Sequence, residues 1–185
     1  ELKSPQAIVI CNTRELADQT SKVVKILSQF TKISHKLCIG GDMQNKFMPN
    51  NVNEHVIIGT PGRLCDLIQK GYIKNEHLKM LIVDEADDVL SVGFRKQVKR
   101  IFTALPKEGQ VILVSATIPQ DMESLFEIIL KPDFTSILIK DDQITLDGID
   151  QYYIDLDEQY KFDAIIDIYQ FINIGQGIIY CNKKS

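Results

Sequence analysis

The chain has 185 residues, of which 44% are hydrophobic and 25% are charged, a composition typical of one globular domain and part of another. Its net charge of −4 excludes a protein that holds nucleic acid by bulk positive charge, so any such contact needs local backbone donors and a few basic side chains. No apolar run approaches the roughly 20 residues of a membrane span. The four cysteines form no CxxC pair, which favours reduced thiols and a cytoplasmic protein, with the nucleus as the alternative compartment.

Short apolar runs alternate with helical periodicity along the chain. Strands are expected at Ala7–Cys11, Lys36–Gly40, His55–Gly59, Met80–Val83, Val111–Val114, Ser136–Ile139, Tyr152–Leu156 and Gly177–Cys181. One helix is expected where Leu16, Val23, Val24, Leu27 and Phe30 share a face, and others at 62–70, 95–105, 120–130 and 158–173. This alternation predicts an α/β fold with a mostly parallel sheet flanked by helices.

A domain boundary is expected near residues 140–149. The stretch 140–143 is polar, and Asp147-Gly148 is a turn signal that precedes a new strand–helix–strand series. We therefore predict a first domain at 1–140, a linker at 141–149 and the start of a second domain at 150–185.

Acidic residues follow one of the buried strands. Asp84, Glu85 and Asp87 come directly after the apolar run 81–83, at the strand end where parallel sheets bind ligands. Acids gathered there need a cation or donors to offset their charge, and Mg²⁺ typically joins one or two carboxylates to phosphate oxygens. In that interpretation Asp84 holds the ion through water and Glu85 positions or deprotonates an attacking water. The alternative is an acidic helix N-cap, and this segment alone leaves the two about even.

Two hydroxyl residues end the next strand. Ser115 and Thr117 follow the apolar run 111–114, so they are expected at the neighbouring strand tip, where they can hydrogen-bond the acids. Alternatively, they simply cap a following helix before Pro119.

Three other strand ends carry turns suited to anions. Thr60-Pro61-Gly62-Arg63 opens a helix, whose free N–H groups and dipole attract phosphate, and Arg63 adds a forked cation. Asn12–Ala17 has the same design, and Gly40-Gly41 permits close backbone approach. Together these turns could follow a sugar–phosphate backbone, although each taken singly is more often a plain strand-to-helix turn.

The ordered set of these segments resembles the successive motifs of DEAD-box RNA helicases. The segments are Thr13–Ala17, Gly40-Gly41, Thr60–Arg63, Asp84–Asp87, Ser115–Thr117 and Ile178–Asn182. Six matches in order are specific where one would carry little weight. The stretches 91–94 and 146–153 look most like the translation-initiation branch of the family, that of initiation factor four-A.

The resemblance implies an ATP-dependent RNA helicase with two RecA-like domains, acting with ATP and Mg²⁺ as a monomer without a membrane, and with translation or RNA-processing factors as partners. It assigns Asp84 and Glu85 to Mg²⁺ and water activation and Asp87 to the link with other motifs. Ser115 and Thr117 would couple ATP turnover to RNA separation. Contacts with the RNA backbone fall to Thr13, Arg14, Gly41, Thr60, Gly62, Arg63 and Asn182.

The sequence departs from the family pattern at three positions and lacks one motif. Asn12 stands where the family usually has proline, and its spacing to Glu15 predicts a capping box; Asp88 and Val92 also differ from the commonest forms. No GxxxxGK[ST] phosphate loop occurs in these residues. We therefore expect the parent protein to continue at both ends, with an uncovered gap in the sheet here, poor folding of these residues alone and no ATPase activity.

Two alternatives to the helicase remain. A noncatalytic RNA- or protein-binding module would explain the missing phosphate loop, although a binder has no need for the acids at Asp84–Asp87. A double-stranded DNA translocase shares the two-domain architecture, but the acidic motif together with Thr60–Arg63 points to RNA. The sequence leaves open which RNA and which pathway are involved.

Overall fold

The computed structural model describes residues 3–41, 51–90, 93–118, 129–130, 133–138 and 148–181. The chain divides into two compact units, Glu1–Thr135 and Ser136–Ser185. Within the described ranges, no helix combines the length and the apolar character required to cross a membrane.

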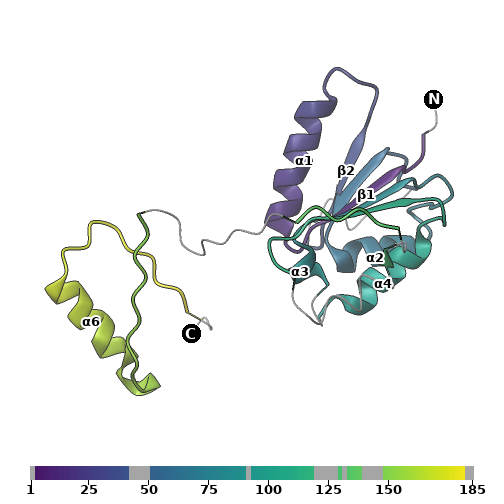
Figure 1. Cartoon of the computed structure of the whole chain (residues 1–185). Coiled ribbons are helices and arrows are strands. Elements are labelled where there is room, and N and C mark those ends of the chain that lie inside the picture. The colour runs from purple at the N-terminus through teal and green to yellow at the C-terminus, as the bar shows by residue number, and fades with distance from the viewer. Residues whose placement is uncertain are drawn as a thin grey trace. The chain divides into compact units, whose positions relative to one another are not determined.

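The first unit is built on a five-stranded sheet. Its strands are β1 (Ala7–Ile10), β2 (His35–Cys38), β3 (Val56–Gly59), β4 (Met80–Val83) and β5 (Gln110–Leu113). All pairs are parallel, and the order is β2-β3-β1-β4-β5 (Figure 1). Because Ile10 is in register with both Gly59 and Val83, the strands end together, and the loops that follow them gather along one edge. The predicted α/β fold with a parallel sheet is confirmed.

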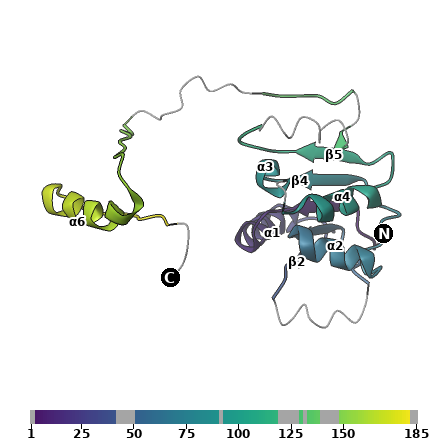
Figure 2. The same cartoon turned by 90° about the horizontal axis from the view of Figure 1, so that it is seen from below.

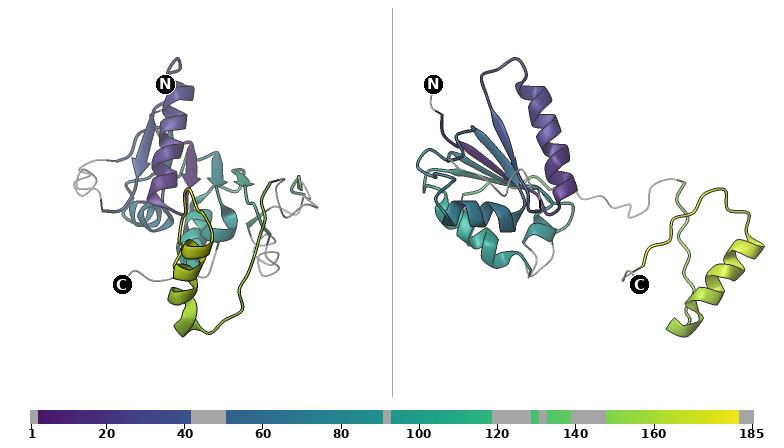
Figure 3. Two further views of the ribbon diagram at one scale, coloured as in Figure 1. Left: turned by 90° about the vertical axis from the view of Figure 1, so that its left-hand side faces the viewer. Right: turned by 180° about the vertical axis from the view of Figure 1, so that it is seen from behind.

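Helices cover both faces of this sheet. They are α1 (Arg14–Ser28), α2 (Pro61–Gln69), α3 (Ala86–Val89) and α4 (Arg95–Ala104). Helix α1 lies on one face, whereas α2 and α4 lie on the other (Figures 1 and 3). The alternation along β1 explains the two layers, because Ile8 and Ile10 join the cluster beneath α2 and α4 while Val9 and Cys11 join the cluster beneath α1.

Helix α1 corrects one detail of the predicted core. Its buried positions are Ala17 and Ser21, with Val24 packed against the same cluster, and these residues follow the i, i+4, i+7 spacing of one helical face. Leu27 and Phe30 are instead 75% and 92% exposed. The large apolar residues that the periodicity assigned to a single face therefore divide between the sheet side and the outer side.

The sheet also corrects the expected internal gap. Strand β4 pairs directly with β5 in parallel register, so the sheet that the described residues form is continuous. Its least covered position is the outer edge, where β5 has only half-buried or exposed residues and Val114 is 52% exposed. Figure 2 shows β5 at this end of the strand order. A missing neighbour would therefore leave an edge open and not a hole.

The second unit contains the helical turn η2 (Glu158–Tyr160) and α6 (Lys161–Phe171), which confirms the helix predicted at 158–173. The strands predicted at Tyr152–Leu156 and Gly177–Cys181 are not formed, and residues 136–138 are not in a strand either. A strand exists only by hydrogen bonding to a neighbour, and the described part of this unit provides none. Cys181 is correspondingly exposed, whereas Cys11, Cys38 and Cys65 are buried. Most of the helix predicted at 120–130 lies outside the described residues.

Candidate functional site

The acidic segment crosses the carboxyl edge of the sheet between β1 and β5, the two strands that flank β4. The backbone N–H of Asp84 donates to the carbonyl of Ile10, at 3.0 Å, and that of Ala86 donates to the carbonyl of Val114, at 2.9 Å. The segment is therefore attached to the ends of both β1 and β5. This attachment holds the carboxylates at the strand tips, where the sequence predicted them.

Glu85 has an unusual backbone conformation. Its φ and ψ are 49° and 56°, and among the described residues it is the one non-glycine residue with positive φ. The left-handed conformation costs about 1–2 kcal/mol in a residue with a Cβ, and such strain is concentrated at functional sites. Glu85 occupies the N-cap position of α3, yet its side chain makes no capping hydrogen bond. The exposed Glu85 carboxylate is thus directed by the strained turn and does not serve as a helix cap.

Asp87 joins the acids to the two hydroxyl residues. Thr117 Oγ1 donates to Asp87 Oδ2 at 2.6 Å, and the backbone N–H of Asp87 donates to Ser115 Oγ at 3.1 Å. The Ser115 hydroxyl in turn donates to the carbonyl of Thr117, at 2.7 Å. The Thr117 hydrogen bond, opposed in part by burial, lowers the pKa of the Asp87 carboxyl below its usual value. The predicted meeting of acids and hydroxyls is confirmed.

The acids at this edge fit a hydrated divalent cation better than a fully protein-ligated one. No cluster of three or more potential metal ligands occurs in the part of the chain that the structure describes. One Asp84 oxygen accepts from the Glu85 N–H, at 3.0 Å, so the second oxygen is available to a ligand. Mg²⁺ keeps several waters and binds through one or two carboxylates together with phosphate oxygens. The remaining Asp84 oxygen fits such an ion, and the water-mediated contact stays a prediction.

Beyond β1, the backbone turn begins helix α1. Thr13 is the N-cap, and its hydroxyl accepts from the N–H of Leu16 at 3.2 Å. The predicted capping box of Asn12 and Glu15 is therefore wrong by one residue. A β-region backbone at Thr13 (φ −119°, ψ 162°) gives its own hydroxyl the correct position for capping.

Arg14 lies against the glycine pair that follows β2. A Cβ added at Gly41 would lie 2.7 Å from Arg14 Nη1, and Gly41 has a φ of +80° that favours glycine. Two of the turns predicted to bind phosphate are thus in contact. Glycine at this position therefore meets two separate requirements. It adopts the positive φ, and it leaves room for the Arg14 side chain.

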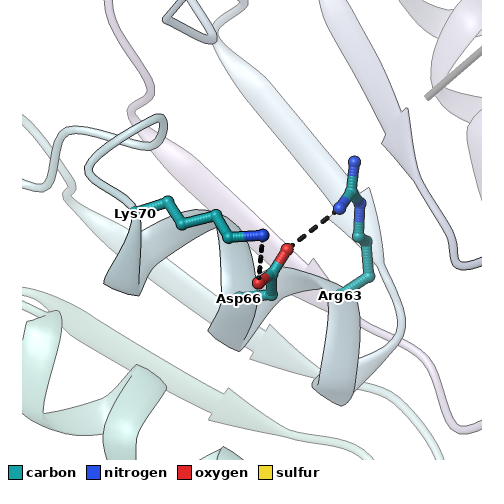
Figure 4. A network of polar contacts seen from close by, with 3 residues as sticks. All are labelled: Arg63, Asp66 and Lys70. Carbon is teal, nitrogen blue, oxygen red and sulfur yellow. Dashed lines mark hydrogen bonds and ion pairs between the residues drawn. The ribbon is translucent and has the colours of Figure 1, made fainter. Parts of the chain in front are cut away.

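Beyond β3, the turn has the predicted design with one added constraint. Helix α2 begins with Pro61 after the N-cap Thr60, whose side chain makes no capping bond, so the first N–H groups of the helix face outward at its positive end. Arg63 Nη1 forms an ion pair with Asp66 Oδ2 at 3.0 Å, and Lys70 Nζ pairs with Asp66 Oδ1 at 2.8 Å (Figure 4). One guanidinium nitrogen of Arg63 is therefore held by a carboxylate of its own helix.

One contact that the sequence did not predict joins Asn12 and Asp88. At both positions the chain departs from the usual motif residues of DEAD-box RNA helicases. Asn12 Nδ2 donates to Asp88 Oδ2 at 2.9 Å, across 76 positions of sequence. Asn12 is the last residue before the N-cap of α1, and Asp88 lies within α3. The unusual residues at both positions were the available signal, but nothing in the sequence indicated that they are neighbours.

Some predicted features cannot be placed or lie elsewhere. Asn182 and Val92 fall outside the described residues. A cavity of about 210 Å³ is lined by Lys3, Ser4, Pro5, Val52, Asn53, Lys74, Glu76 and His77. Those residues precede the strands, whereas the ligands of open parallel sheets bind beyond the strands' carboxyl ends. This cavity is therefore not the candidate site.

A protein-family model covers all the residues of this sheet edge. A family model described as DEAD/DEAH box helicase matches residues 1–125, which include all three phosphate turns, the acids and the hydroxyl pair. The chain belongs to this family. Its first 125 residues thus account for the whole sheet edge described above.

Curated relatives extend the likeness over the whole chain. The ATP-dependent RNA helicase eIF4A of Kluyveromyces lactis is 41% identical over 100% of this chain and 47% of its own length. Eukaryotic initiation factor 4A of Dictyostelium discoideum is 40% identical over 100% of the chain and 46% of its own length. The chain therefore spans about half the length of the curated relatives that it matches. The resemblance to the initiation-factor branch is borne out.

Solved structures of the family share the fold. Saccharomyces cerevisiae Dbp5, determined with RNA and ADP BeF3, has a TM-score of 0.78 at 33% identity and covers 91% of this chain and 43% of its own. A DEAD box protein from Methanococcus jannaschii has a TM-score of 0.68 at 29% identity, over 90% of this chain and 45% of its own. The RecA-like fold predicted from the motifs is thereby supported at the level of the backbone.

Proposed function

We propose that the intact protein carrying this sequence is an ATP-dependent RNA helicase that separates short RNA duplexes locally. The proposal rests on how two kinds of residues are distributed along one edge of the sheet. Strands β2, β3 and β1 end in the three turns suited to phosphate, whereas the adjoining β4 and β5 end in the acids and hydroxyls. An RNA strand and a nucleotide would therefore occupy neighbouring stretches of the same edge.

The RNA-facing stretch suits backbone contacts. Thr13, Arg14, Gly41, Thr60, Gly62 and Arg63 offer helix N-terminal amides, small residues and cations, which bind phosphate without reading bases. We also propose that Asn182, in the second domain, contacts the RNA backbone. The chain's net charge of −4 agrees with a contact limited to such local donors, and no sequence specificity is expected.

The acidic stretch suits hydrolysis of a phosphoanhydride by water. Glu85, exposed on its strained turn, would orient the attacking water and take its proton. Mg²⁺ held through water by Asp84 would offset the charge that develops on the phosphate oxygens. Asp87, hydrogen-bonded by Thr117, would carry the state of the nucleotide to the residues that follow β5.

Residues 1–140 and 150–185 would belong to two RecA-like domains joined by a linker at 141–149. ATP and RNA would close the two domains onto each other and bend one RNA strand, and hydrolysis with phosphate release would restore the open state. The eIF4A relatives support a role in translation initiation. We place the protein in the cytoplasm, as a monomer with translation or RNA-processing factors as partners.

Residues 1–185 alone are expected to be inactive and marginally stable. Helix α6 has no buried residue, and the outer edge of β5 is uncovered, so much apolar surface lacks the burial that offsets conformational entropy.

The test is ATP hydrolysis by the intact protein with and without single-stranded RNA. A helicase hydrolyses ATP faster when RNA is present and separates a short RNA duplex when ATP is supplied. A noncatalytic binding module would bind RNA but hydrolyse no ATP under either condition. A double-stranded DNA translocase would instead respond to duplex DNA, so parallel assays with the two nucleic acids distinguish all three possibilities.

A further inference from the structure

One side-chain hydrogen bond crosses the border between the two halves of the sheet edge. Asn12 follows β1, the last strand of the RNA-facing stretch, and Asp88 follows β4, the first strand of the acidic stretch. Their 2.9 Å bond lies one residue from Thr13 on one side and one residue from Asp87 on the other. Together with the Thr117–Asp87 bond, it forms a continuous chain of polar contacts from α1 to the residues after β5.

The orientation of the Asn12 amide is dictated by Asp88. A carboxylate only accepts hydrogen bonds, so it must face the NH₂ group of the amide and not its oxygen. Asn12 Oδ1 is consequently buried with no hydrogen-bond partner among the described residues. Leaving an acceptor unsatisfied carries a cost, so this geometry is maintained at the expense of local stability.

We propose that Asn12 is a positioning residue that couples RNA binding at Thr13 and Arg14 to the geometry of the acidic segment. The proposal rests on the proposed helicase function. When RNA draws the turn before α1 into a fixed position, the bond transmits that position to α3, and therefore to Asp87. Because binding linkage is reciprocal, ATP bound at the acids tightens RNA binding by the same factor.

A structural role would predict a different outcome from a coupling role. Asp88 is exposed and Asn12 only half-buried, and a bond of this kind contributes little to global stability because water competes for both partners. Its loss should therefore change the response to RNA much more than it changes unfolding.

The experiment is a set of substitutions in the intact protein, assayed for ATP hydrolysis across RNA concentrations. Asn12→Ala removes the bond, and Asn12→Asp places two carboxylates against each other. Both are expected to raise the RNA concentration for half-maximal stimulation by about fivefold or more, the lower range of measured allosteric couplings. Hydrolysis without RNA should stay as in the unsubstituted protein in both variants. The unfolding temperature should stay unchanged in Asn12→Ala and fall slightly in Asn12→Asp, whose two carboxylates repel each other.

Exchange of the two side chains provides the control. Asp88→Asn alone retains an acceptor for the Asn12 amide and should behave normally. The double variant Asn12→Asp with Asp88→Asn restores the bond with donor and acceptor exchanged, and it should recover the normal RNA response.

Two results would overturn the proposal: a normal RNA response in Asn12→Ala, or a double variant that melts normally but responds to RNA no better than Asn12→Asp. If the unsubstituted protein shows no RNA stimulation at all, the proposed function itself is wrong, and that result is distinct from both.

Discussion

Thr117 Oγ1 lies 2.6 Å from Asp87 Oδ2 and donates a hydrogen bond to that carboxylate, although the two residues are 30 positions apart in the sequence. The parallel pairing of β4 with β5 makes this contact, because it brings the residues after both strands to the same edge. The bond joins the acids, which we assign to ATP chemistry, with a segment that leads away from them.

Removal of this bond should change the titration of Asp87. Because Thr117 lowers the folded-state pKa of Asp87, its bond contributes stability above the unfolded pKa of about 3.9, and that contribution is lost as the pH falls through the folded pKa. Thr117→Val should therefore raise the Asp87 pKa and reduce the free energy of unfolding at neutral pH by less than about 1 kcal/mol, because the bond is exposed to water. Carbon-detected NMR titration of the aspartates and denaturant unfolding at several pH values measure both effects. A stability difference that persisted unchanged below the folded-state pKa of Asp87 found in the titration would contradict the assignment.

The strained backbone at Glu85 predicts an unusual stability ranking. Glycine tolerates a φ of 49° without the cost that alanine retains, so Glu85→Gly should be more stable than Glu85→Ala. The strain of about 1–2 kcal/mol is offset in part by the greater unfolded-state entropy of glycine, which leaves a difference of roughly 0.5–1 kcal/mol. Urea unfolding of the two variants measures it, and a less stable glycine variant would show that Glu85 is not strained.

Gly41→Ala tests the contact with Arg14. The added Cβ would meet Arg14 Nη1 at 2.7 Å in a backbone with φ +80°, so the guanidinium must move, and RNA binding should weaken by about tenfold, near 1.4 kcal/mol. Gly71 provides a matched control because its φ is +71° and an added Cβ meets no atom within 4 Å. Gly71→Ala should carry the same backbone strain and leave RNA affinity unchanged in a fluorescence-anisotropy titration. Equal affinities of the two variants would exclude a role for the Arg14 contact.

Asp66→Asn tests how the Arg63 side chain is used. Asp66 pairs with both Arg63 and Lys70, so its neutralisation releases one guanidinium nitrogen and removes a negative charge next to the proposed RNA path. RNA affinity should increase by a few-fold, with a steeper salt dependence, while stability changes by less than about 1 kcal/mol because the pairs are partly exposed. Lys70→Gln breaks only the outer pair and should reduce affinity slightly or leave it unchanged. Weaker RNA binding in Asp66→Asn would contradict the assigned role of Arg63.

Much of the first unit could be predicted from the sequence, because its apolar runs and turns report the sheet directly. Strands β1 and β4 begin where predicted, and the acids lie at the strand end expected of a parallel sheet. The places where the structure differs from the prediction have physical causes. Helix α1 turns Leu27 outward, and Phe30, which follows the end of the helix, is exposed as well, since periodicity defines an apolar face but not which part of it is covered.

Features of the candidate site that depend on residues distant in the sequence could not be predicted. The strands expected in the second unit did not form, because strand formation depends on a neighbour and not only on the segment itself. The N-cap at Thr13 in place of Asn12 depended on a backbone angle. The Asn12–Asp88 bond depended on the strand order, which places β1 beside β4 and could not be read from residue spacing.

Single-turnover hydrolysis of ATP by the intact protein, with RNA present, tests the central claim most directly when Glu85→Gln is compared with the unsubstituted protein. Removing a general base typically costs 10²–10⁴-fold in rate, so hydrolysis should fall by about 10²-fold or more while ATP and RNA still bind. Undiminished hydrolysis by Glu85→Gln would show that the acids at this sheet edge do not activate water, and would contradict the account.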